Sequence, residues 1–302
     1  MTNLQYWYGD DVDKKFRSNA LEILNGKLGA MNSLPESFED ECIKTAKAIY
    51  AEYPNIHIAL SGGWESNVCL EAFIRAGITP GVYILRFPSH LNGQDSNVAI
   101  DRCKKFSIFP KIIDVKFDKF VAEHMITTAT KYQTYSFFQA LQAYCIETLN
   151  EDVLLVDKLE LRRDINPTVS WSLVLDEDYS FWPERFNLLN DKKIVSNFYT
   201  RTPELMYSFL TAPAIVDLVN TPLSGKLSLN SSKNFIYQQC GFGELEQQRV
   251  RKTVGTNRIQ GLQKSHSYTI QQHLKFKPRP LYISYEDVMV ALENQGITCQ
   301  YI

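Results

Sequence analysis

The sequence predicts an α/β protein: a mainly parallel sheet with flanking helices, followed by a mainly helical C-terminal region. Short apolar runs alternate with segments of helical periodicity, and glycines and prolines separate them. Parallel strands need crossovers of a dozen or more residues, usually helices, so this alternation indicates right-handed βαβ units. We divide the 302 residues into an N-terminal extension (1–34), an α/β core (35–165) and a C-terminal region (166–302).

The first predicted helix covers residues 35–53. Ser33 and Glu36 form a capping-box pattern before it, and Pro35 suits its first turn. The elements that follow repeat one pattern, in which an apolar strand leads into a helix. The predicted strands are 56–60, 82–87, 111–115 and 153–156, and the predicted helices between them are 66–76, 95–106, 118–130 and 133–149.

The first predicted strand stops at Ser61-Gly62-Gly63, and Glu65 and Ser66 follow at the start of a helix. Glycine tolerates positive φ, so the chain can turn tightly here and bring backbone N–H groups close to an anion. The helix adds its free N–H groups and positive dipole end, and the serine hydroxyls can donate hydrogen bonds. Glu65 can face a metal ion carried by phosphates. The pattern therefore predicts a phosphate site at the carboxyl edge of the sheet, where ligands bind in such folds.

The fourth predicted strand ends in a dense cluster of charged residues, 157–164. A solvated loop is the ordinary explanation for any one of them. Their position at a strand end beside the glycine loop favours a functional role equally. Beyond Pro167 the sequence is irregular and aromatic, and a helix begins again at Thr202, with Pro203 in its first turn.

Composition narrows the class of protein. A formal net charge of −2 gives no electrostatic case for binding nucleic acid or an anionic membrane. No apolar stretch approaches the roughly 18 residues that span a bilayer, and the first residues lack the features of a secretory signal. We therefore expect a cytoplasmic protein with no membrane or nucleic-acid partner. The six dispersed cysteines form no C-x-x-C pair, which argues against a zinc cluster and a disulfide framework.

The glycine loop resembles the Ser-Gly-Gly-x-Asp-Ser signature of the PP-loop ATP pyrophosphatases, with Glu65 at the aspartate position. The segment 201–220 resembles the helical C-terminal part of the asparagine synthetase family, and 232–237 is similar to that family's Lys-(Tyr/Phe)-Leu-Leu-Arg segment. The resemblance spans roughly residues 35–260. It implies an adenine nucleotide alpha hydrolase-like fold and an ATP-dependent ligase, which adenylates a carboxylate or a carbonyl oxygen with release of pyrophosphate and transfers the product to an amine or ammonia.

The resemblance also implies roles for individual residues, with ATP and Mg²⁺ as cofactors. Glu65, Lys233 and Asp157 are the expected catalytic residues. Glu65 would hold Mg²⁺, and Asp157 and Glu160 would bind a second metal or an amine of the acceptor. The expected nucleotide-binding residues comprise the glycine loop, the end of the second strand, where the family receives adenine, and a basic run that could form a lid: Ser61, Gly62, Gly63, Ser66, Arg86, Phe87, Arg251 and Lys252.

The sequence departs from the asparagine synthetase family in several ways. It begins Met1-Thr2-Asn3 and has too few residues before the loop for a glutaminase domain, so nitrogen would come from ammonia, an amine-bearing substrate or a separate glutaminase. The acceptor is expected to be a small molecule. Two alternatives stay open: a PP-loop sulfurtransferase or nucleobase-modifying enzyme, and an ATP-binding module without catalysis. The Glu65 change motivates the second alternative, because the longer arm would shift the metal.

Overall fold

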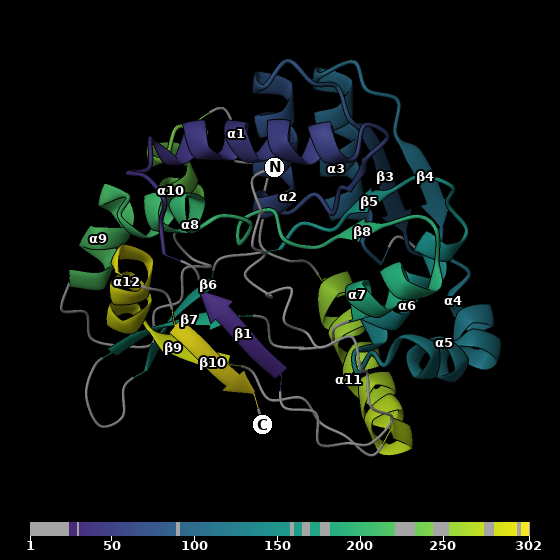
Figure 1. The fold of residues 1–302 in the computed structure, drawn as a ribbon. Coiled ribbons are helices and arrows are strands. Elements are labelled where there is room, and N and C mark those ends of the chain that lie inside the picture. Colours follow the sequence, from purple (N-terminus) through teal and green to yellow (C-terminus); the bar gives the residue numbers. More distant parts are fainter. Residues whose placement is uncertain are drawn as a thin grey trace.

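The computed structural model describes most of the chain: residues 24–28, 30–88, 91–157, 160–164, 170–175, 182–220, 233–243, 254–274, 281–294 and 297–301. Its centre is a five-stranded parallel sheet with the order β4-β3-β2-β5-β8 (Figure 1). These strands are β2 (His57–Ala59), β3 (Gly81–Arg86), β4 (Lys111–Asp114), β5 (Val153–Leu154) and β8 (Ile194–Val195). The predicted parallel α/β fold is therefore confirmed.

The strand order reverses beside β2. After β2 the chain adds β3 and β4 on one side, and then β5 and β8 on the other. A ligand crevice forms at such a switch point, outside the carboxyl ends of the strands. The glycine loop leaves β2 at this end of the sheet. Because β8 pairs with β5, the sheet takes its fifth strand from the 166–302 region.

Helices cover both faces of the sheet, because successive strand residues point to opposite faces. Val82 and Ile84 pack in a core with α1 (Phe38–Glu52), α2 (Trp64–Arg75) and α3 (Gly93–Lys105). Tyr83 lies in a second core that includes residues of the helices that cover the other face, α6 (Phe137–Glu147) and α7 (Trp182–Leu189).

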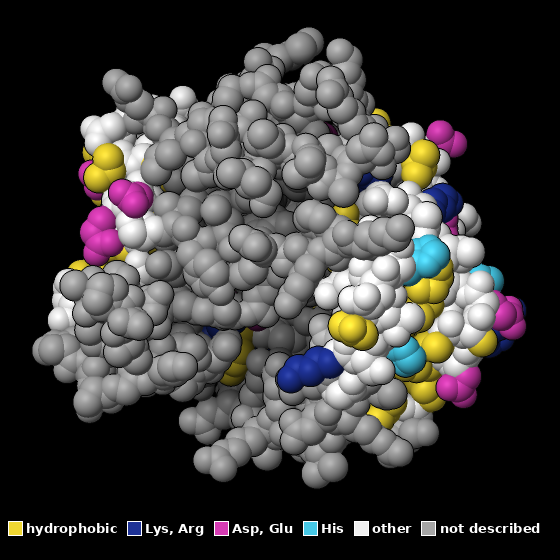
Figure 2. All heavy atoms as spheres, turned by 90° about the horizontal axis from the view of Figure 1, so that it is seen from below, with side chains coloured by type: hydrophobic (Ala, Val, Ile, Leu, Met, Phe, Trp, Pro, Cys, Tyr) yellow, Lys and Arg dark blue, Asp and Glu magenta, His cyan; other side chains and the backbone are white. Residues whose placement is uncertain are grey.

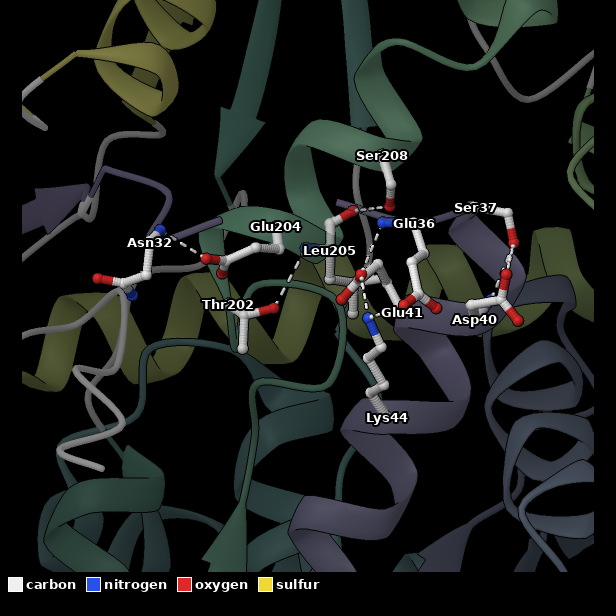
Figure 3. Close-up of polar contacts among 10 residues, drawn as sticks. All are labelled: Asn32, Glu36, Ser37, Asp40, Glu41, Lys44, Thr202, Glu204, Leu205 and Ser208. Atoms are coloured by element: carbon white, nitrogen blue, oxygen red, sulfur yellow. Dashed lines mark hydrogen bonds and ion pairs between the residues drawn. The ribbon is translucent and has the colours of Figure 1, made fainter. Parts of the chain in front are cut away.

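The start of α1 differs from the prediction. The N-cap is Ser37, whose hydroxyl accepts a hydrogen bond from Asp40 N at 3.1 Å, so Ser33 is not the cap (Figure 3). Glu36 precedes the helix, and its backbone N–H donates to the carboxylate of Glu41 in the first turn at 2.9 Å. The two polar positions Ser37 and Asp40 repeat the spacing of the predicted capping pair four residues later, which explains the displaced boundary.

Two predicted helices are divided or moved. The helix after the glycine loop begins at Trp64 rather than Ser66, so Glu65 lies in its first turn. The predicted helix over 118–130 is interrupted by a π-helical turn. The segment consists of α4 (Phe117–Lys119), η2 (Phe120–His124) and α5 (Met125–Tyr132). The helices α8 (Pro203–Leu210), with Thr202 as its N-cap, α9 (Pro213–Asn220) and α10 (Lys233–Gln239) follow later.

The chain also contains strands outside the central sheet that the sequence did not indicate. Part of the charged cluster expected as a loop forms β6, which pairs with β7 and through it with β9 in an antiparallel sheet. A second small sheet joins β1 near the start of the described chain to β10 near its end (Figure 1). The elements are β1 (Leu24–Leu28), β6 (Glu160–Asp164), β7 (Ser170–Leu175), α11 (Val254–Leu274), β9 (Leu281–Ser284), α12 (Tyr285–Glu293) and β10 (Ile297–Tyr301).

Five cysteines are free and buried: Cys42, Cys69, Cys103, Cys145 and Cys240. Burial raises the pKa of the Cys103 thiol to about 11 and that of Cys145 to about 12. They serve as packing residues, as expected for Cys69 and Cys103. Among the described residues no helix is both long and apolar enough to span a bilayer. On the described part of the face in Figure 2, hydrophobic, basic, acidic and histidine side chains are intermixed.

Candidate functional site

The glycine loop is built as a turn between a strand end and a helix start. Gly62 has φ +78°, a conformation that L side chains rarely adopt, and Gly63 is the extended N-cap of α2. The two hydroxyls lie 3.0 Å apart, Ser61 Oγ accepts from Gly63 N at 3.2 Å, and Ser66 Oγ donates to Gly63 O at 3.2 Å. Ser61 is exposed, so its hydroxyl is presented to solvent at the positive end of α2. The four loop residues thus lie together at the start of α2, where the helix dipole and free N–H groups favour an anion.

Lys233 reaches this loop from 168 residues further along the chain. Its ammonium donates to the Glu65 carboxylate, and the two side chains are only 9% and 17% exposed. The first residue of α10 is thereby held against the first turn of α2, and the two helices are in contact. A lysine is almost never buried unless it is paired, so this ammonium is not a solvated surface charge.

Asp157, three residues beyond β5, is a second expected catalytic carboxylate, and it holds a turn of the chain. Its Oδ1 accepts from Tyr199 N at 2.7 Å, and its Oδ2 accepts from the N–H and hydroxyl of Thr200 at 3.0 and 2.7 Å. Burial raises the pKa of Asp157 to about 6, although these hydrogen bonds to its charged form oppose the shift. Tyr199 in turn donates its hydroxyl to the Glu65 backbone carbonyl at 2.8 Å. The end of β5 is therefore connected through Tyr199 to the first turn of α2.

Two buried tyrosines, Tyr199 and Tyr237, lie close to Glu65. Burial raises the pKa of both Tyr199 and Tyr237 well above the usual value, and the negative charge of Glu65 raises both further. Their hydroxyls therefore stay neutral at any physiological pH.

The end of β3 is organised differently. The Arg86 guanidinium binds the Asp114 carboxylate of the neighbouring strand through two hydrogen bonds, at 2.5 and 2.7 Å. The Phe87 ring stacks on Phe138, away from the glycine loop. Its backbone N–H donates to the side chain of Asn92 at 2.8 Å. The Arg86 and Phe87 side chains are thus engaged by Asp114 and Phe138, and the Phe87 N–H is bound by Asn92.

The residues present fit a phosphate group better than a dedicated metal cage. Among the described residues no three histidine, cysteine or acidic side chains form a cluster that could hold a metal ion. Asp157 is occupied by the 199–200 turn. Mg²⁺, however, is commonly held by one or two carboxylates together with substrate phosphates, a role open to Glu65. The Oδ1 of Asn67, in the same turn, is a buried oxygen without a hydrogen-bond partner in the described part of the chain.

Several predicted residues fall outside this geometry. Arg251 and Lys252, and Ser232 before Lys233, lie outside the described residues. Glu160 belongs to the described backbone of β6, but its side chain does not belong to the described part. The structure brings together Ser61, Gly62, Gly63, Glu65, Ser66 and Lys233, and it places Asp157 one turn of chain away through Tyr199.

The sequence reasoning missed Tyr199, Thr200 and Asn92. Tyr199 and Thr200 precede the predicted helix at Thr202 and follow a two-residue strand, which is too short to show periodicity. Asn92 had a signal, since Asn92-Gly93 follows the strand that Pro88 ends and marks a turn at the crevice.

Comparisons with known proteins add little. No protein-family model and no curated protein matches the chain. Among solved structures, it resembles an NMN synthetase from Francisella tularensis, at 14% identity and a TM-score of 0.31 over 80% of this chain and 95% of that chain. It also resembles an NH3-dependent NAD synthetase from Campylobacter jejuni, at 14% identity and a TM-score of 0.32 over 82% and 100%. Likenesses of this strength give no basis for assigning an activity.

Proposed function

We propose that this chain is an ATP-dependent synthetase of the PP-loop type. It would adenylate a carboxylate or a carbonyl oxygen, release pyrophosphate, and transfer the activated group to an amine or ammonia. The observation that carries this proposal is the burial of Lys233 against Glu65 at the start of α2. A cation held beside a glycine turn and a helix N-terminus supplies what a departing pyrophosphate requires.

The adenylation step has residues assigned to it. The acceptor oxygen attacks the α-phosphorus, and the bond from that phosphorus to the bridging oxygen breaks, so pyrophosphate leaves with its charge. The backbone around Gly62 and Gly63 and the hydroxyls of Ser61 and Ser66 would bind the leaving group. Lys233 would offset its charge as the bond breaks. An amine or ammonia then attacks the acyl carbon, AMP leaves, and one proton is lost from nitrogen.

The roles of the carboxylates follow from their surroundings. Glu65 would hold Mg²⁺, which would neutralise phosphate charge, and its ion pair with Lys233 would have to open for this. Asp157 would act by keeping Tyr199 on the first turn of α2. Glu160, Arg251 and Lys252 remain proposed contacts to the acceptor and the phosphates. The finer proposal is that the acceptor reaction is asparagine synthetase-like, with nitrogen from ammonia, an amine or a separate glutaminase.

The products of ATP cleavage test the proposal. The protein is incubated with Mg²⁺, ATP labelled at the α-phosphate, ammonia and a panel of carboxylates, and nucleotides are separated by chromatography. We expect AMP and pyrophosphate in equal amounts, dependent on one acceptor. ADP and orthophosphate as the sole products under turnover would exclude adenylation.

Substitution of Glu65 tests the metal role. Glu65→Gln should lose most Mg²⁺-dependent turnover, because a charged ligand is removed at constant shape. Glu65→Asp should retain activity or raise it, since it restores the arm length of the resembled signature. Wild-type turnover and unchanged Mg²⁺ dependence in Glu65→Gln would show that this carboxylate is not a ligand.

A second candidate function is an ATP-binding module without catalysis. It is favoured by one observation: the two carboxylates expected to be catalytic are both engaged by the protein, Glu65 by Lys233 and Asp157 by the 199–200 turn. Isothermal titration with ATP separates the candidates. Tight ATP binding with no AMP released for any acceptor would favour the module, and acceptor-dependent AMP would favour the enzyme.

A further inference from the structure

Two backbone groups at the end of β3 point to the side of the strand on which β2 and the glycine loop lie. The Tyr83 carbonyl accepts from Leu60 N at 3.0 Å, so the backbone groups of residue 83 point toward β2. The carbonyl of Arg86, an even-numbered residue, accepts from Val115 N on the opposite side. Because strand residues alternate in direction, Leu85 O and Phe87 N point to the β2 side as well. There β2 has already ended, and the chain has turned into the glycine loop.

The side chain of Asn92 fills this position. Its Nδ2 donates to Leu85 O at 2.7 Å, and its Oδ1 accepts from Phe87 N at 2.8 Å. Since a carbonyl can only accept and a backbone N–H can only donate, the orientation of the carboxamide is fixed by its partners. Asn92 precedes α3 but gives its own helix no side-chain cap, so its hydrogen bonds serve β3 and not the helix.

The first turn of α3, which follows Asn92, also contacts the glycine loop. A Cβ placed on Gly62 would lie 2.0 Å from the backbone oxygen of Asp95. Gly62 is therefore required for two reasons: its φ is positive, and the backbone of α3 leaves no room for a side chain. The start of α3 covers both the predicted phosphate loop and the backbone pair at the end of β3.

The pattern that Asn92 presents is one that a nucleobase can also present. Adenine carries an amino donor next to a ring-nitrogen acceptor, which is the same adjacent pair as the carboxamide. Guanine carries an acceptor and a donor in the reverse order. It would have to turn over to bind this pair, which would direct its ribose away from the glycine loop.

We propose that Asn92 is an internal competitor of the nucleotide base. Its carboxamide occupies the Leu85–Phe87 pair, and ATP must displace it to bind there. This inference rests on the proposed function, because it requires that the crevice accept ATP. Asn92 thereby sets the affinity for the base, while the phosphate affinity is set by the loop and Lys233.

Removing the competitor should strengthen ATP binding. Asn92→Ala is expected to lower the Kd for Mg²⁺-ATP by roughly tenfold, the scale of one or two net hydrogen bonds no longer broken on binding. Inorganic tripolyphosphate carries no base, so its affinity should be unchanged. Asn97→Ala, an exposed asparagine on the same helix, is the matched control and should alter neither affinity. Isothermal titration measures all three proteins.

A direct readout uses nuclear magnetic resonance of the wild-type protein, so it does not depend on the folding of a variant. The side-chain amide signals of Asn92 should shift when ATP is added and stay in place with tripolyphosphate. In Asn92→Ala, amide exchange at Phe87 should accelerate without ligand and slow again with ATP.

The outcomes separate the two proposals. ATP binding with equal or lower affinity in Asn92→Ala, or Asn92 signals unmoved by bound ATP, would overturn the competitor role and leave the proposed function intact. Failure of the wild-type and variant proteins to bind either ATP or tripolyphosphate would overturn the proposed function and, with it, the competitor role.

Discussion

Two ion pairs lie at the carboxyl edge of the same parallel sheet, and they differ mainly in exposure to water. Lys233 and Glu65, above the end of β2, are 9% and 17% exposed. Arg86 and Asp114, at the ends of β3 and β4, are 43% and 67% exposed. The exposed pair has the better geometry, because guanidinium and carboxylate meet through two hydrogen bonds.

The difference teaches that geometry alone does not identify a functional charge. Water and salt screen an exposed pair, whereas charges in a less polar setting interact strongly and are costly to leave alone. The buried pair also joins two helices that are far apart in sequence, whereas the exposed pair joins neighbouring strands that already share a ladder. A charged ligand that disturbs the Lys233–Glu65 pair would therefore act on the contact between α2 and α10, whereas disturbing the Arg86–Asp114 pair would leave the strand pairing in place.

The largest expected effect is that of Lys233→Met, which keeps much of the aliphatic stem and removes the ammonium. The Glu65 charge is then left uncompensated, so the free energy of unfolding should fall by roughly 3 kcal/mol. If Lys233 acts on the leaving pyrophosphate, turnover should fall by roughly 100-fold or more, with a smaller loss of ATP affinity. Urea unfolding and steady-state kinetics measure the two effects.

Lys104→Met provides the matched control. Lys104 pairs with Asp101 on the surface of α3, where the side chains are 70% and 56% exposed. This variant should retain stability and turnover. Wild-type stability and turnover in Lys233→Met would remove the distinction between the buried and the exposed pair.

A smaller effect should appear in the pH dependence of stability. Asp157 has a pKa of about 6 in the folded protein against an ordinary value of 3.8. Between these values the folded state binds more protons than the unfolded state, so the free energy of unfolding should decrease as pH rises from about 4 to about 6. At about 1.4 kcal/mol per pKa unit, the decrease attributable to Asp157 is about 2–3 kcal/mol. Urea unfolding across this window measures it.

Asp157→Asn should remove this contribution to the slope, whatever its effect on absolute stability. Asp114 supplies the opposite case, because the hydrogen bonds from Arg86 lower its pKa. Its contribution is fully present above about pH 5 and is lost as the pH falls further, so Asp114→Asn should leave the slope between about pH 5 and 6 unchanged. An unaltered slope in Asp157→Asn would show that its carboxyl titrates normally.

The smallest effect should follow from Arg86→Ala. The pair with Asp114 is exposed and screened, so its loss should leave the unfolding midpoint and the ATP affinity within experimental error. The backbone around Phe87 is retained in this variant. A clear loss of ATP affinity would mean that the guanidinium itself contacts the nucleotide and that exposure is a poor guide at this edge.

Much of the fold could be predicted from the sequence. The strands and helices from residue 56 to 115 are bounded by strong signals, such as Gly77 and Pro88, and differ from the prediction by only one or two residues. The prediction failed where elements are short or depend on partners. The strand β8 has two residues, too few to show a period. The strand β6 is mostly charged and forms through its pairing with β7, so no apolar run marks it in the sequence.

The candidate site divides in the same way. The glycine loop is local, and its turn, cap and hydroxyls could be predicted from consecutive residues. The position of Lys233 could be suggested only through a resemblance, because no local pattern reports a contact across 168 residues. The hydrogen bonds of Asp157 were not foreseeable, since two come from the backbone of the 199–200 turn and the third from the Thr200 hydroxyl, more than 40 residues along the chain.

The buried cysteines have a practical consequence. A thiol reacts with alkylating reagents as its thiolate, and burial both shields these thiols and keeps them protonated. Each alkylation rate therefore reports how often its neighbourhood opens. Cys240 follows α10, which begins with Lys233, while Cys145 lies on α6 across the sheet. Mass spectrometry of the two labelled peptides would measure two alkylation rates in the same protein. The rate at Cys240 reports opening beside α10, and the rate at Cys145 reports opening around α6.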